Sequence, residues 1–146
     1  MMNSTTKRYI FYAINIIGGI SVLYSYAHGL STHIELRENL WGDIPLFIRP
    51  YYTLNMILAA IGYFFFTNYI LKKIVVNNHK HLNLINILYA GIIVPSAIWM
   101  PMTFEILKNP TDLLWLGIQI VLFIVGLSTT VLILFFFSKI RQNNWH

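Results

Sequence analysis

The chain has 146 residues, of which 57% are hydrophobic and only 10% are charged. Such a composition has more apolar and fewer charged residues than a soluble domain needs for its surface. The length suits a single domain. The absence of cysteine excludes disulfides, iron–sulfur clusters and thiolate zinc sites. The formal charge of +5 would suggest nucleic acid in a soluble protein. Here the basic residues lie beside apolar runs, where they orient membrane helices, so we expect no nucleic-acid partner.

Four apolar runs dominate the sequence, and none has a charged residue in its interior. Each is near or above the ~20 residues that a helix needs to cross ~30 Å of hydrocarbon. Backbone groups in lipid must bond within their own segment, which favours helices. The sequence therefore predicts an all-α integral membrane protein, a bundle of four transmembrane helices forming one membrane domain of residues 1–146. The predicted spans are residues 9–27, 51–71, 84–102 and 113–137.

Charge divides the polar segments into two sets. Seven of the ten basic residues lie in the amino-terminal segment, the middle connection and the carboxyl tail: Lys7, Arg8, Lys72, Lys73, Lys80, Lys139 and Arg141. The other three lie with all five acidic residues in the remaining two connections. By the positive-inside rule, both termini are expected in the cytoplasm of a multi-pass protein of the cell (inner) membrane.

The first apolar run has an alternative interpretation. Two basic residues precede it, and it ends at Ser25-Tyr26-Ala27, a small-x-small pattern typical of signal-peptide cleavage. A cleaved protein would keep three spans and begin outside the cytoplasm. The sequence leaves both interpretations open.

The connection of residues 28–50 is the longest and lies on the non-cytoplasmic side in this topology. Within it, residues 33–41 mix apolar and charged side chains, which predicts a short interfacial amphipathic helix with Ser31 or Thr32 as its cap. Either a lid over the bundle or an interfacial loop anchored by Trp41 is compatible with this pattern.

The third run contains Pro95 and Pro101. A proline in a helix lacks an N–H and crowds the carbonyl four residues back, so the third helix is expected to be kinked at both positions. Irregular backbone at membrane depth usually faces protein or a cavity, which makes this stretch either a binding site or a structural kink.

At the second of these prolines, Trp99-Met100-Pro101 resembles an element of the tryptophan- and proline-rich membrane receptors of the translocator-protein type. Those receptors have five spans and further tryptophan motifs that this chain lacks. We therefore transfer no residue role from them.

The predicted topology gathers polar and aromatic residues at the non-cytoplasmic ends of the helices. Arg49 lies at the membrane boundary, where its cation needs an acid such as Asp43 or Glu105, a carbonyl or a lipid headgroup. Such groups above apolar helices could form the mouth of a pocket, although aromatic belts and snorkelling arginines are also common in membrane proteins. The predicted ligand-binding residues are Asp43, Arg49, Tyr52, Asn55, Trp99, Glu105 and Trp115.

Enzyme and cofactor signatures are weak. The spacing of His28, His33, Glu35 and Glu38 matches no zinc motif, so neither a metal nor another cofactor is expected. The leading hypothesis is a non-catalytic protein that binds a lipid-like or small apolar ligand, or a membrane-protein partner, or a second copy of itself. One alternative is a small enzyme acting on a lipid headgroup with Glu105 or Asp43 as acid or base. Another is a structural subunit of a membrane complex.

Overall fold

The computed structural model describes residues 3–72 and 81–143, which form helices and short connections. Within these residues, four helices are long and apolar enough to cross a membrane, as the sequence predicts. The first of them is continuous but contains a π-helical segment, η1, between α1 and α2. The elements are α1 (Ser4–Ala13), η1 (Ile14–Gly18), α2 (Gly19–Thr32), α3 (Arg49–Ile70), α4 (Leu82–Lys108) and α5 (Asp112–Asn143).

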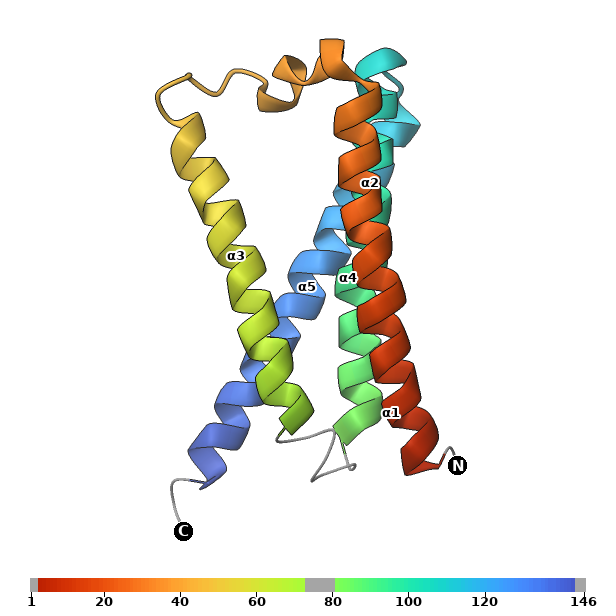
Figure 1. Ribbon diagram of the computed structural model, residues 1–146, viewed down its shortest axis with the longest axis vertical. Helices are drawn as coiled ribbons and strands as arrows, with labels where there is room; N and C mark the ends of the chain where they lie inside the picture. Colours follow the sequence, from red (N-terminus) through yellow and green to blue (C-terminus); the bar gives the residue numbers. More distant parts are fainter. Residues whose placement is uncertain (1–2, 73–80, 144–146) are drawn as a thin grey trace.

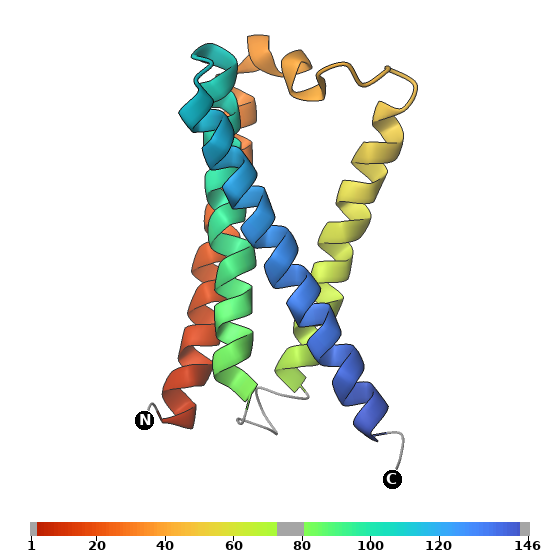
Figure 2. The same cartoon turned by 180° about the vertical axis from the view of Figure 1, so that it is seen from behind.

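The helices form an open bundle (Figure 1). The continuous helix α1–η1–α2 and α4 lie side by side and run in the same direction, and α5 packs along α4 while crossing it obliquely. The start of α1 and the end of α5 lie at one end, here called the terminus end, and the connection of residues 33–48 lies at the other, the loop end. In both views α3 approaches the other helices at the terminus end and diverges from them toward the loop end (Figure 2).

The core lies in the half of the bundle nearer the terminus end. At its centre the Tyr89 ring lies 4.9 Å from the Phe11 ring, and its hydroxyl lies 3.1 Å from the Thr67 hydroxyl. Tyr89 thus joins α4 to both α1 and α3. The buried members of this cluster are Phe11, Ile70, Leu82, Ile85, Leu88, Tyr89, Ile93, Leu132 and Phe136. The core is small for so apolar a chain, and a helix that crosses a membrane does not need to bury its lipid-facing side chains in protein.

The π-helical segment η1 supplies a polar link to α3. The Asn15 amide group donates to the Phe11 carbonyl over 2.8 Å, and its oxygen accepts from the Tyr63 hydroxyl over 2.6 Å. Every residue of α3 from 51 to 62 is exposed, so this helix packs on the bundle through its second half. Such short π segments interrupt α-helices and often occur at functional sites.

Helix α4 remains helical through Pro95 and Pro101 and ends at Lys108, beyond the predicted end at Met102. Its extra turn carries Phe104, which is only 2% exposed because it packs beneath Gly29 of α2. A Cβ atom added to Gly29 would lie 2.7 Å from the Phe104 ring. Close approach of α2 and α4 therefore depends on this glycine.

The connection at the loop end differs from the prediction. The hydroxyls of Ser31 and Thr32 do not cap a following helix but donate back to the His28 carbonyl, over 3.1 and 2.7 Å. Serine and threonine commonly bond to a carbonyl three or four residues earlier, which here belongs to the last turn of α2. Where a short amphipathic helix is predicted, the connection forms two short 3₁₀ helices, η2 (Ile34–Leu36) and η3 (Glu38–Trp41).

Candidate functional site

A groove of about 560 Å³ lies between α2 and α4 in the half of the bundle nearer the loop end. We call it the α2–α4 groove. Its walls come from α2 between Ile20 and Gly29, from His33, and from α4 between Ala97 and Glu105. Because the two helices run in parallel, rising residue numbers on both walls lead toward the loop end. The groove is open at its side, where Ile20 and Ile98 are 62% and 46% exposed.

Polarity changes along the α2–α4 groove. Its end near the middle of the helices is formed by Ile20, Ala97 and Ile98, which offer only hydrocarbon. Hydroxyl groups follow on α2, and at the loop end the walls carry His28, His33 and Glu105. The groove therefore joins an apolar half to a half with two imidazoles and a carboxylate.

The Glu105 carboxylate in the groove wall and the Lys108 ammonium one turn further along α4 have separate partners. The Lys108 ammonium lies 3.2 Å from Nε2 of His33, and because an ammonium only donates, Nε2 is the acceptor. A neutral His33 then carries its proton on Nδ1. Oε1 of Glu105 accepts from the Asn109 side-chain amide over 2.9 Å. Among the residues that the structure describes, Glu105 has no ion pair.

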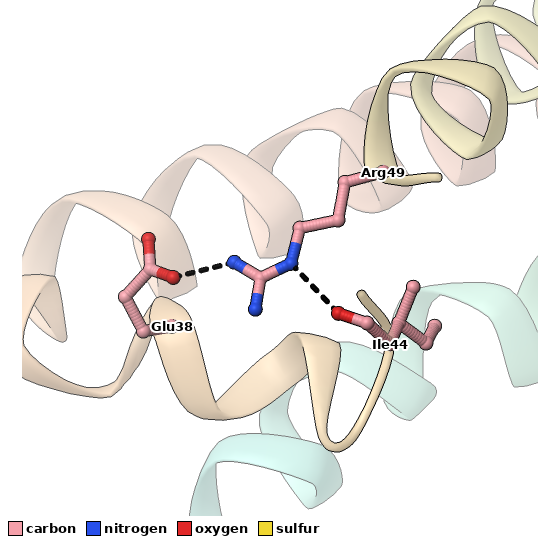
Figure 3. Close-up of polar contacts among 3 residues, drawn as sticks. All are labelled: Glu38, Ile44 and Arg49. Carbon is pink, nitrogen blue, oxygen red and sulfur yellow. Dashed lines mark hydrogen bonds and ion pairs between the residues drawn. The ribbon is translucent and has the colours of Figure 1, made fainter. Parts of the chain in front are cut away.

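Arg49 lies away from the groove, at the start of α3, and ties this helix to the connection before it (Figure 3). Its Nη1 forms an ion pair with Glu38 at 2.5 Å, and its Nε donates to the Ile44 carbonyl over 3.1 Å. The guanidinium also stands 5.5 Å from the centre of the Trp41 ring, within cation–π range. Its acidic partner is thus neither of the two suggested by the sequence.

Removal of the charge on Glu38 is expected to affect the connection more than the bundle. Glu38 is 78% exposed in its side chain, and exposed ion pairs contribute about 1 kcal/mol or less. Glu38→Gln should therefore change the free energy of unfolding by less than about 1 kcal/mol, while amide hydrogen exchange in residues 38–48 becomes faster. Glu35→Gln, in the same connection, is the control and should change neither. A loss of several kcal/mol in Glu38→Gln would contradict the exposed, local role.

The remaining predicted site residues do not join Glu105. Trp99 packs against Tyr26, with ring centres 5.9 Å apart, and is not part of the groove wall. Trp115 is 57% exposed beside the α4–α5 connection, where it lines a separate shallow hollow. The other three, Asp43, Tyr52 and Asn55, are exposed on the connection and on α3. Glu105 and Asp43, the suggested acid–base pair, are not brought together in the groove.

Several groove residues are absent from the predicted ligand-binding set. Ser21, Ser25 and His28 follow one another at spacings of four and three residues, which places them on one face of a helix. This row of polar residues on an otherwise apolar span is the sequence feature from which these groove residues could have been predicted. His33, by contrast, joins the site only because the last turn of α2 ends just before it.

A second cavity of about 440 Å³ lies between η1, α2, α3 and α4 and is almost entirely apolar. Its polar wall residues are Asn15, Tyr63 and Ser96, and each has a bond within the protein. The Ser96 hydroxyl donates to the Ile92 carbonyl over 2.6 Å. This cavity offers little to orient a polar ligand, so the α2–α4 groove is the better candidate site.

Metal ligation does not account for the polar end of the groove. Within residues 3–72 and 81–143, no three His, Cys, Asp or Glu side chains are close enough to share an ion.

Compared with protein-family models, with curated proteins and with solved structures, the chain shows no match in any of the three.

Proposed function

We propose that this protein is a non-catalytic membrane protein that holds one lipid-like, amphiphilic molecule in the α2–α4 groove. The main support for this proposal is that the groove lining changes along its length. It is apolar at Ile20 and Ile98 and polar at His28, His33 and Glu105. An amphiphile has the same order of apolar and polar parts. The volume of about 560 Å³ also lies within the range of about 300–1,000 Å³ typical of ligand sites.

The open side of the groove determines how such a ligand reaches it. Ile20, Tyr24 and Ile98 are exposed along the groove and would face bilayer hydrocarbon in a membrane. A lipid can therefore enter sideways, with its chain along these residues and its headgroup at the level of His28 and Glu105. No aqueous path through the bundle is required.

The proposed orientation places the groove in the non-cytoplasmic leaflet. The amino-terminal segment, the middle connection and the carboxyl tail carry seven of the ten basic residues in the sequence, which favours a cytoplasmic location of both termini in the cell (inner) membrane. We also propose that α4 is bent at Pro95 and Pro101, since each proline removes one backbone hydrogen bond. Pro101 and Ala97 both belong to the groove wall, so a bend there would shape the groove.

Filling the groove with a bulky side chain is the direct test of lipid binding. Ser21 is exposed, lines the groove and donates to the Ile17 carbonyl over 2.9 Å. Ser21→Phe should reduce lipid retained after purification by at least about tenfold, as measured by native mass spectrometry, because the ring occupies the space of the chain.

A matched control is available on α5. Thr130 is also exposed and bonds back to the carbonyl four residues earlier, but it lies outside the groove. Thr130→Phe should retain lipid like the unaltered protein. Equal retention in both variants would contradict the proposed site.

A membrane-protein partner, or a second copy of this chain, is the second candidate function. It is favoured by α3, whose residues 51–62 are exposed all round because the helix diverges from the bundle. The same native mass spectra distinguish the two candidates. A complex of fixed stoichiometry without bound lipid would favour the subunit role over the lipid-binding role.

A further inference from the structure

We infer that the α2–α4 groove selects phospholipids whose headgroup carries a primary ammonium, with the Glu105 carboxylate as its acceptor. This inference rests on the proposed lipid-binding function and adds the class of ligand. It is carried by the side chains at the loop end of the groove, where the Glu105 carboxylate shares the lining with two imidazoles, one of which bonds to Lys108.

The acceptor is Glu105. Its Oε1 accepts from the neutral Asn109 amide, and no cation among the described residues pairs with this carboxylate. Lys108, one turn further on, directs its ammonium to His33 instead. Glu105 is exposed at the mouth of the groove, and Pro101 and Phe104 form the wall beside it. A ligand ammonium with N–H donors would supply the missing counter-charge.

The donors for the phosphate of the same headgroup stand on the opposite wall. Because Lys108 donates to Nε2 of His33, a neutral His33 keeps a proton on Nδ1 and can donate it. His28 is a second imidazole on this wall, and the Lys108 ammonium lies 3.2 Å from Nε2 of His33. His33 packs edge-on against Phe104, with ring centres 4.8 Å apart. This contact connects the donor wall to the residue next to Glu105.

The arrangement distinguishes three common headgroups by chemistry alone. A primary ammonium can donate to Glu105, whereas a trimethylated ammonium has the same charge but no N–H to donate. A glycerol headgroup has no cation and leaves the phosphate beside an unpaired carboxylate. The apolar half of the groove, at Ile20 and Ile98, commits the ligand to a chain-bearing lipid rather than a free amine.

The test is competition between phospholipids for the full-length protein, read by native mass spectrometry. Equal amounts of phosphatidylethanolamine, phosphatidylcholine and phosphatidylglycerol with identical chains are offered together. We expect phosphatidylethanolamine to be bound in preference to phosphatidylcholine by roughly tenfold, the effect of one charge-assisted hydrogen bond. In Glu105→Gln the lipid should still bind, but this preference should fall to about twofold or less.

Glu35→Gln is the matched control, since this exposed carboxylate lies outside the groove, and it should keep the full preference. Equal binding of the two lipids by the unaltered protein would overturn the headgroup inference and leave lipid binding intact. A preference that persists in Glu105→Gln would overturn the role of Glu105. Absence of any bound lipid would overturn the proposed function itself.

Discussion

Replacement of Tyr89 with alanine is expected to cause the largest loss of stability in this chain. The Tyr89 side chain is 1% exposed, packs on the Phe11 ring at 4.9 Å and shares a hydrogen bond with Thr67. Truncation of a buried aromatic residue costs about 3–5 kcal/mol because it removes contacts and leaves a cavity. Tyr89→Ala should lower the free energy of unfolding by that amount, measured by titration with denaturing detergent and circular dichroism.

Two further variants separate the causes of this loss. Tyr89→Phe removes only the hydroxyl that meets Thr67 and should cost roughly 1 kcal/mol or less, as interhelical hydrogen bonds in membranes do. Phe123→Ala truncates an aromatic side chain that is 69% exposed on α5 and should cost less than about 1 kcal/mol. If Phe123→Ala were as destabilising as Tyr89→Ala, the core would not lie where we describe it.

Replacement of Gly29 with valine is expected to separate α2 from α4. A Cβ atom at this position would lie 2.7 Å from the Phe104 ring and 3.2 Å from Cγ of Met100. Both neighbours are buried, at 2% and 4% exposure, so neither can move away without disturbing the packing. Overpacking of this kind costs about 1–3 kcal/mol. Gly29→Val should show this loss in the same detergent titration and should also lose the bound lipid, because Gly29 lines the groove.

The control for this variant is another helical glycine. A Cβ atom added to Gly126 of α5 meets no atom within 4 Å. Gly126→Val should therefore leave the free energy of unfolding within about 0.5 kcal/mol of the unaltered protein and should keep the lipid. A stable, lipid-retaining Gly29→Val would show that α2 and α4 are not in close contact at this level.

The four spans could be predicted because membrane thickness sets the length that an apolar helix needs to cross it, and each apolar run is close to that length or longer. The helices nevertheless extend past the apolar runs at several ends. Helix α4 continues from Met102 to Lys108 because Phe104 is buried against α2, a tertiary contact that hydropathy does not report. The π segment around Asn15 likewise depends on the Tyr63 hydroxyl of another helix.

The candidate site was harder to predict because it depends on how each helix is rotated. Trp99 and Glu105 are near in sequence, but on an α-helix they point about 120° apart, and only Glu105 reaches the groove. The acid paired with Arg49 is Glu38, which lies in the 3₁₀ helix η3. This helix is too short to produce a periodic pattern in the sequence, so the pair could not be predicted. His28 and His33 were considered as metal ligands, and the structure instead places them on the wall opposite Glu105.

The most direct measurement of the central claim is photo-cross-linking of the protein with a phospholipid that carries a diazirine in its chain, followed by mapping of the modified residues. Our account predicts saturable labelling concentrated on α2 between Ile20 and Gly29 and on α4 between Ala97 and Glu105, reduced by excess unlabelled lipid and by Ser21→Phe. Labelling spread evenly over the lipid-exposed faces, with α3 and α5 modified as strongly and no competition by unlabelled lipid, would contradict a specific lipid site in the groove.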